Sequence, residues 1–134
     1  MGFQILVSEK AYGIIRKYRT PDYSIIPSRI ETFDKKYFMI GFPMIEDKTI
    51  DLKKSTFYDI ELEKEISYES YDAYAEINFS RHPLETYLTE VYDYDIINLQ
   101  GEGMYFSETL ITELEKNEII GFVRKNSILY NEIK

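Results

Sequence analysis

The sequence predicts an α+β fold, in which a mixed or mainly antiparallel sheet carries two or three helices packed on it. Apolar residues recur at helical spacing in residues 8–18 and 107–116, and each segment opens with a serine after a short apolar run. Residues 23–33 and 37–42 are rich in β-branched and aromatic residues, which is typical of strands. Helices and strands mixed in this order are typical of helices packed on a sheet.

The N-terminal third predicts a helix followed by a hairpin. Ser8 is a favourable N-cap, and Glu9 complements the positive end of the helix dipole. Pro27 lies inside the extended segment 23–33, so we expect an edge strand or a bulged strand there. That strand and a buried strand over residues 37–42 predict a hairpin, because only a short polar turn separates them.

The centre of the chain gives a weaker pattern. Residues 49–52 predict a short strand, residues 57–66 fit a strand or a helix, and residues 71–79 favour a strand toward their end. Pro83 suits a first helical position, and the residues after it place apolar side chains on one helical face. We therefore expect a helix from Pro83 to about Val91, with Leu84, Tyr87, Leu88 and Val91 on its apolar face.

The C-terminal third predicts a strand over residues 95–99, a turn at residues 101–103 and the clearest helix of the chain. Ser107 caps that helix, and Leu110, Ile111 and Leu114 face inward. Residues 118–124 predict a last strand, and the tail from residue 126 to residue 134 is expected to be ordered through Ile128, Leu129 and Tyr130.

Length and composition predict a single domain over residues 1–134, which is large enough to bury a core without a metal or a disulfide. The absence of cysteine excludes disulfides, thiolate catalysis and cysteine metal sites. Neither a signal peptide nor a membrane-spanning run is recognisable, so we expect a soluble, cytoplasmic protein without a membrane partner. A net charge of −8 repels phosphates, and no nucleic-acid partner is expected.

Negative charge and tyrosines are concentrated in the middle of the chain. Residues 59–95 carry a net charge of −9, whereas residues 1–58 carry +3 and residues 96–134 carry −2. Carboxylates steer the encounter with a basic partner, and tyrosines supply rigid contact area with a polar tip. The predicted partner-binding residues are Tyr68, Glu69, Tyr71, Asp72, Tyr74, Glu76, Glu90, Tyr92, Asp93, Tyr94 and Asp95.

Two alternatives to such a surface remain open. Each tyrosine can instead be a core residue whose acidic neighbours are merely solvated. In addition, a strand over residues 92–95 would place Tyr92 and Tyr94 on one face and Asp93 and Asp95 on the other, which would divide the surface.

Catalytic and metal-binding patterns are weak. Ser80 and His82 are close in sequence and suggest a small hydrolase, but Ser80 lacks a nucleophile elbow and His82 is the one histidine. The acidic residues at positions 47, 51, 61, 63 and 65 do not follow a calcium-loop spacing. Gly101 and Gly103 lack the third glycine and the lysine of a phosphate loop. We therefore expect no catalytic residue, no metal and no cofactor, and the hydrolase stays an alternative.

Four segments, in their order, resemble bacterial immunity proteins of polymorphic toxin systems, in the families numbered eleven and forty-three. They are ILVSEKAYGIIRKY at 5–18, SIIPSRIETF leading into KKYFMIGF at 24–42, IDLKKSTF at 50–57 and MYFSETLITELEKNEIIGF at 104–122, where Ile120 takes a position at which threonine is common. The resemblance implies a small cytoplasmic protein that binds and neutralises a cognate toxin, without catalytic residues and with contact surfaces that vary with the toxin.

Together, the resemblance and the charge pattern predict a protein that covers the basic active site of a toxin, for which a nuclease is one candidate. The alternative is an inhibitor from a phage or a mobile element that mimics DNA and blocks a host nuclease. Both functions need an acidic surface, but a mimic spreads its carboxylates along one elongated face, whereas an immunity protein adds an apolar or aromatic centre.

Overall fold

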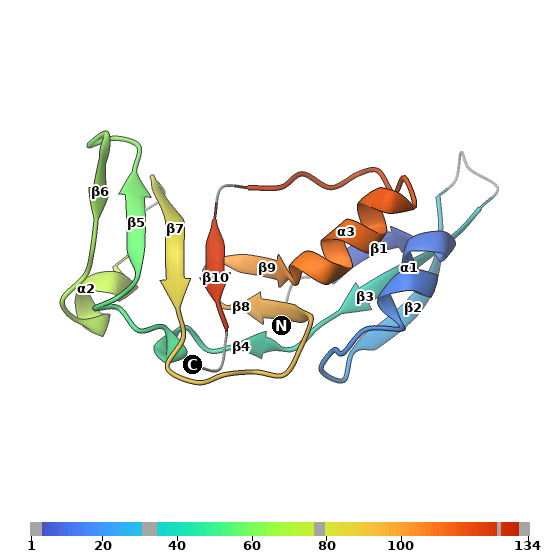
Figure 1. The fold of residues 1–134 in the computed structure, drawn as a ribbon, viewed down its shortest axis with the longest axis horizontal. Coiled ribbons are helices and arrows are strands. Elements are labelled where there is room, and N and C mark those ends of the chain that lie inside the picture. The colour runs from blue at the N-terminus through green and yellow to red at the C-terminus, as the bar shows by residue number, and fades with distance from the viewer. Residues whose placement is uncertain (1–3, 31–34, 77–79, 126, 132–134) are drawn as a thin grey trace. The chain divides into compact units, whose positions relative to one another are not determined.

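A computed structural model describes residues 4–30, 35–76, 80–125 and 127–131. These residues form an α+β fold with three α-helices, a short 3-10 helix and ten strands in three sheets, which confirms the predicted fold class (Figure 1). The chain divides into two compact units, each of which is described by itself. The first unit comprises residues 1–45 and 93–123, and the second comprises residues 46–92 and 124–134. None of the described helices has the length and apolar composition that crossing a bilayer requires.

The first sheet of the first unit has the strand order β1-β3-β2, with β1 spanning Gln4–Ser8, β2 Ser24–Arg29 and β3 Lys36–Gly41. All pairs are antiparallel, so β2 and β3 form the predicted hairpin. The apolar strand β3 is central, and its Ile40 is fully buried. Pro27 lies in the edge strand β2, as expected for a residue that cannot donate to a ladder on both sides.

Two strand–serine–helix units complete the first unit. Strand β1 leads into α1 (Glu9–Ile15), and β9 (Gly103–Phe106) leads into α3 (Glu108–Lys116). The Ser8 hydroxyl accepts a hydrogen bond from the Ala11 amide at 3.1 Å, and Ser107 accepts one from Leu110 at 3.2 Å. Both predicted N-caps are therefore confirmed.

Strand β9 belongs to a second sheet, of order β4-β8-β9, with β4 spanning Met44–Ile45 and β8 spanning Ile96–Leu99. All four residues of β8 are buried. Side chains from both sheets and both helices meet in one apolar core, which consists of Ile14, Ile15, Ile40, Phe42, Ile96, Leu110 and Leu114.

The second unit is built on one sheet of order β10-β7-β5-β6. Its strands are β5 (Thr56–Asp59), β6 (Lys64–Ile66), β7 (Arg81–Tyr87) and β10 (Ile128–Tyr130), and β10 runs parallel to β7. The 3-10 helix η1 (Asp47–Thr49) and the helix α2 (Tyr71–Ala75) accompany the sheet. The segment 57–66, for which a strand or a helix was expected, therefore forms an antiparallel hairpin of β5 and β6. In the tail, residues 128–130 form a strand, and residues 126 and 132–134 lie outside the described residues.

The predicted helix after Pro83 is wrong, because residues 81–87 form β7. Pro83 lies opposite Phe57, and the register then shifts so that Glu85 lies opposite Thr56. Proline within a sheet is typical of such irregularities, where the regular ladder is already interrupted. In this strand the fully buried residue is Thr86, whereas the predicted helix would have buried Leu84, Tyr87, Leu88 and Val91.

Three other predictions of secondary structure are wrong or changed. Residues 118–124 form no strand, because the chain turns at Glu118 and bends at Gly121, where φ is 57° and 99°. Residues 71–75 are helical, and the expected strand end at 77–79 lies outside the described residues. The predicted strand at 49–52 is replaced by η1 and an isolated bridge between Ile50 and Leu88.

Candidate protein-binding site

Two tyrosine phenols meet a group of carboxylates around η1 in the second unit. The Tyr71 hydroxyl donates a hydrogen bond to Asp47 Oδ1 at 2.9 Å, and the Tyr92 hydroxyl donates one to Glu90 Oε2 at 3.2 Å. The charges of Glu46 and Asp72 act on these phenols as well. We call this group the acidic–tyrosine patch, and it consists of Glu46, Asp47, Tyr71, Asp72, Glu90 and Tyr92.

Local hydrogen bonds hold the patch together. Ser70 caps α2 by accepting from the Ala73 amide at 3.2 Å, which fixes Tyr71 in the first turn of the helix. The Thr89 amide donates to the Thr49 carbonyl at 2.8 Å, so the segment after β7 is tied to η1. Asn131 then fixes Tyr92, since its side chain accepts from the Tyr92 amide at 2.8 Å and donates to the Tyr92 carbonyl.

The patch carries a negative potential that acts on both phenols. The hydrogen bond to the Asp47 carboxylate is the largest cause that raises the pKa of Tyr71, followed by burial and by the charges of Asp47, Glu46 and Asp72. Burial is the largest cause that raises the pKa of Tyr92, followed by Glu90 and with a contribution from Glu46. Glu46 acts on both rings, so the two phenols stay neutral donors within one field.

Three carboxylates of the patch are available to a partner. Across the described part of the chain, Glu46, Asp72 and Glu90 have no basic side chain within salt-bridge distance. One cation of the chain itself already lies at the patch, because the Lys48 ammonium is 5.8 Å from the centre of the Tyr71 ring. The site can therefore accept lysine or arginine side chains, both on ring faces and at carboxylates.

Tyr74 does not belong to this surface, which corrects the sequence-based assignment. Its side chain is 2% exposed and packs against Phe57 and Tyr68, with ring centres 5.8 and 5.6 Å away. The Arg81 guanidinium lies 4.3 Å from the centre of the Tyr74 ring and donates to the Tyr74 carbonyl at 2.8 Å and to the Tyr68 hydroxyl at 3.2 Å. Tyr68 is half-buried in the same cluster, so both rings support α2 from inside.

Glu69 and Glu76 flank α2 and are exposed, next to the patch in sequence. The last three predicted residues, Asp93, Tyr94 and Asp95, fall in the first unit. Residues 92–95 form no strand, so the alternative in which a strand divides their side chains between two faces does not apply. The predicted set is thus divided between the two units.

Asp93 and Asp95 are both engaged by Arg19. The Arg19 guanidinium pairs with both carboxylates, and the Arg19 amide donates to Asp95 Oδ2 at 3.0 Å. Asp95 is only 8% exposed, so its assignment to a partner-binding surface is corrected: it stabilises the segment after α1. Tyr94 remains exposed at 38%.

A second exposed feature of the second unit escaped the sequence analysis. The β5–β6 hairpin ends in Ile60 and Leu62, which are 52% and 59% exposed, with Glu61 and Glu63 beside them. The buried Asp59 carboxylate accepts from the Leu62 amide at 3.1 Å and so shapes this turn. The sequence signal for this turn was Asp59 followed by alternating apolar and acidic residues at positions 60–63. The same alternation also fits a strand or a helix, so the turn was not predicted.

Glu46 and Asp47 were not predicted as partner-binding residues, because they precede the acidic stretch in sequence. The net positive charge of residues 1–58 concealed them. Only the fold places η1 beside α2 and the segment after β7.

The Ser80 and His82 pair has no arrangement typical of a hydrolase. The Ser80 hydroxyl donates to Asp59 Oδ1 at 3.0 Å, whereas a nucleophilic serine donates to an imidazole. His82 is exposed on β7, opposite Tyr58. In the residues described, no three histidine, aspartate or glutamate side chains are grouped in a way that could hold a metal ion.

Comparison with known proteins gives no match to a family model, a curated protein or a solved structure. The resemblance to immunity proteins therefore stays a prediction, and the acidic–tyrosine patch is the basis for a functional proposal.

Proposed function

We propose that this protein is a bacterial immunity protein, which neutralises a toxin by binding a basic surface of that toxin through the acidic–tyrosine patch. The observation that supports this most directly is a group of three carboxylates, Glu46, Asp72 and Glu90, around two neutral phenols. Within the described ranges, none of the three has a cationic partner. A surface of this kind suits the binding of a basic protein and requires no chemical reaction with it.

The expected energetics follow from the charges. Close charge pairs across protein interfaces contribute about 1.5–7 kcal/mol of coupling energy, and complementary potentials raise association rates toward about 10⁸–10⁹ M⁻¹s⁻¹ at low salt. The phenols add rigid contact area, and as neutral groups they can donate hydrogen bonds. We therefore expect tight and fast binding that weakens as the salt concentration increases.

Interfaces also need an apolar centre, and the hairpin tip offers one candidate. Ile60 and Leu62 are exposed aliphatic side chains on a turn whose backbone is fixed by Asp59. Apolar anchors of this kind carry much of the binding energy when they fill a pocket on the partner. The tip lies at the end of the β5–β6 hairpin away from α2 (Figure 1), so in this proposal the interface extends along the hairpin, with the patch at one end and Ile60 and Leu62 at the other.

The proposal is tested with the product of the gene adjacent to the one that encodes this chain, as the candidate toxin. Co-expression of the wild-type protein should restore growth that the toxin arrests. The triple variant E46K/D72K/E90K should lose this protection and bind the purified toxin at least about tenfold more slowly at low salt.

The matched control is the triple variant D22K/E85K/E115K, which changes the net charge equally but at exposed acids outside the patch. It should protect nearly as well as the wild type. Equal loss in both triples would show that net charge alone matters, and equal protection by both would show that the patch does not bind the toxin.

A further inference from the structure

The strand β1 presents an open edge. It lies at the end of its sheet and pairs only with β3. Among the described residues, the ladder to β3 accounts for the backbone pairing of residues 4–7, and no further backbone hydrogen bond joins them to another segment. The amides and carbonyls on this side can therefore pair with another extended chain.

The two edges of this sheet differ in their protection. Strand β2, at the opposite edge, contains Pro27 and ends in Arg29, and such residues block pairing with another strand. Strand β1 has the sequence QILVS, without proline, charge or bulge, and its central Leu6 is 45% exposed. An edge of this kind is expected to be covered in the functional state of the protein.

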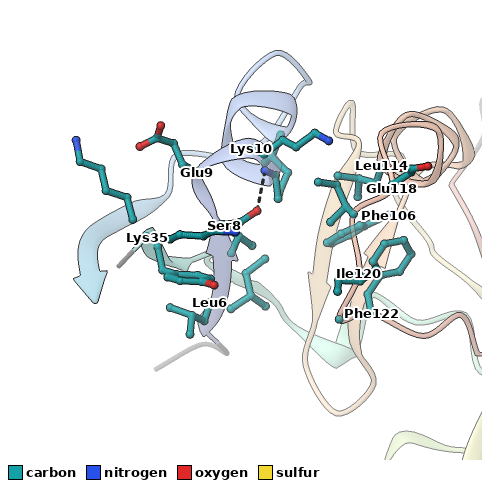
Figure 2. A pocket seen from close by; sticks show the side chains of 18 residues that line it. Leu6, Ser8, Glu9, Lys10, Lys35, Phe106, Leu114, Glu118, Ile120 and Phe122 are labelled. Atoms are coloured by element: carbon teal, nitrogen blue, oxygen red, sulfur yellow. Dashed lines mark hydrogen bonds between the residues drawn. The ribbon is translucent and has the colours of Figure 1, made fainter. Parts of the chain in front are cut away.

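A groove of about 920 Å³ lies along this edge. Figure 2 shows Leu6 and Ser8 on one side of it, with Phe106, Ile120 and Phe122 on the other. Ile15, Phe106 and Leu114 contribute apolar lining, while Lys35 and Lys36 contribute positive charge where β3 begins. The groove is thus bounded by β1 and by the segment that follows α3.

The open backbone edge specifies the kind of occupant. An acyl chain or a helix in the groove would leave the amides and carbonyls of β1 without partners, which is unfavourable when they are buried. An extended peptide satisfies them. Its side chains should be apolar, and an acidic residue at its N-terminal end would lie near Lys35 and Lys36, if it runs antiparallel to β1.

The chain itself contains a segment with side chains of this kind. Residues 119–123 belong to no helix or strand and are apolar, with Ile120 92% exposed and Val123 88% exposed. The chain bends at Gly121, whose φ is 99°, so this segment must straighten there to pair as a strand. Glu118 precedes them and supplies the acidic N-terminal end. The segment cannot readily close onto β1 of its own copy, because the Ile119 amide is held by the Leu114 carbonyl at 3.0 Å and Lys10 donates to the Asn117 carbonyl at 2.7 Å.

We propose that two copies of this chain interlock through these grooves, so that residues 119–123 of each copy lie in the groove of the other. Each segment pairs with β1 of the second copy on one side and with the equivalent segment on the other. Across the interface, the order is β1 of one copy, residues 119–123 of the second copy, residues 119–123 of the first copy and β1 of the second copy. A two-fold axis lies between the two segments. This proposal does not depend on the proposed function, because it uses only residues of the first unit.

The test is the oligomeric state, measured by sedimentation velocity over a wide range of protein concentration. The wild type should form dimers that dissociate on dilution. The variant I120K/V123K should raise the dissociation constant at least about tenfold, which corresponds to about 1.4 kcal/mol. Both side chains are exposed in the single copy, so the variant should keep the wild-type melting temperature.

The matched control is I25K/I26K, which places two lysines on exposed isoleucines of the protected edge strand β2. The single variant I26K separates the effect of one charge. Both should leave the dissociation constant within about twofold of the wild type. A labelled synthetic peptide of residues 118–125 should also bind the I120K/V123K variant, and L6K should abolish that binding.

Three results would overturn the proposal. One is a wild type that remains monomeric at every concentration. The second is a dimer that is insensitive to I120K/V123K. The third is a dimer that I25K/I26K dissociates, since this would place the interface at the other edge of the sheet.

Discussion

Replacing Leu110 by alanine should destabilise the first unit by about 3–5 kcal/mol. Leu110 is fully buried in the apolar core between the helices and the sheets, and it does not line the groove. Removal of its side chain therefore leaves a closed cavity, whose walls lose both apolar burial and dispersion contacts. The closed site puts the expected loss in the upper part of the range for leucine to alanine.

Leu114 offers a graded comparison one helical turn away. It is 2% exposed and belongs to the same core, but it also lines the groove beside β1. Space left by Leu114→Ala can open into the groove, so we expect a smaller loss, of about 2–3 kcal/mol. Leu62→Ala is the surface control, because Leu62 is 59% exposed, and it should change the free energy of unfolding by less than about 0.5 kcal/mol.

The assay is urea unfolding followed by far-ultraviolet circular dichroism, with transition midpoints compared at constant slope. The expected order of destabilisation is Leu110→Ala, then Leu114→Ala, then Leu62→Ala. A Leu110→Ala variant as stable as the wild type would refute the placement of α3 in the core. A larger loss for Leu114→Ala than for Leu110→Ala would refute the argument that the groove relieves its cavity.

Three further predictions concern the second unit and the glycine turn. Arg81→Ala should lower the free energy of unfolding by about 2 kcal/mol or more in the same urea assay, because Arg81 lies against three aromatic rings and donates to the Tyr74 carbonyl; a change below about 0.5 kcal/mol would contradict this. The pKa of Tyr92 is raised, so the contribution of its neutral phenol to stability is complete below the ordinary tyrosine pKa of about 10 and is lost as the pH rises further. Glu90→Gln should lower the pKa of Tyr92, as measured by ultraviolet difference titration. An unchanged titration would contradict the hydrogen bond between Tyr92 and Glu90. Gly103→Ala should destabilise by about 1–2 kcal/mol, since Gly103 has a φ of 105°, and an unchanged midpoint would contradict that turn.

Local signals predicted most elements of the first unit, with the strand at residues 118–124 as the exception. Ser8 and Ser107 are N-caps because their hydroxyls lie within reach of the third helical amide, which depends only on neighbouring residues. Pro27 predicted an edge strand because the missing donor is a property of the residue itself. The α+β fold class followed from these elements, but the division of the sheets between two units did not, since it depends on contacts between distant segments.

Tertiary context decided the elements that the sequence did not predict. Residues 83–91 have apolar side chains at helical spacing, yet pairing with β5 and β10 makes residues 81–87 a strand. Residues 118–124 have strong β-propensity, but the described chain offers them no strand partner. A strand forms only when its backbone pairs with another strand, and local sequence does not show which segment supplies that partner.

The candidate site shows the same limit. Acidic residues and tyrosines of the middle stretch do meet at the surface, as with Tyr71, Asp72, Glu90 and Tyr92. Tyr74 and Asp95 have the same local composition but are buried, because one completes an aromatic cluster and the other binds Arg19. Composition thus located the region, while only the packing separates surface residues from core residues.

The central claim is that the protein acts by binding through the acidic–tyrosine patch. The most direct measurement is the association rate of the candidate toxin with the wild type, with E46K/D72K/E90K and with D22K/E85K/E115K, by stopped-flow at several salt concentrations. The account predicts that the patch variant alone associates at least about tenfold more slowly at low salt, and that the difference shrinks as salt screens the charges. Equal rates for all three proteins at low salt would contradict it.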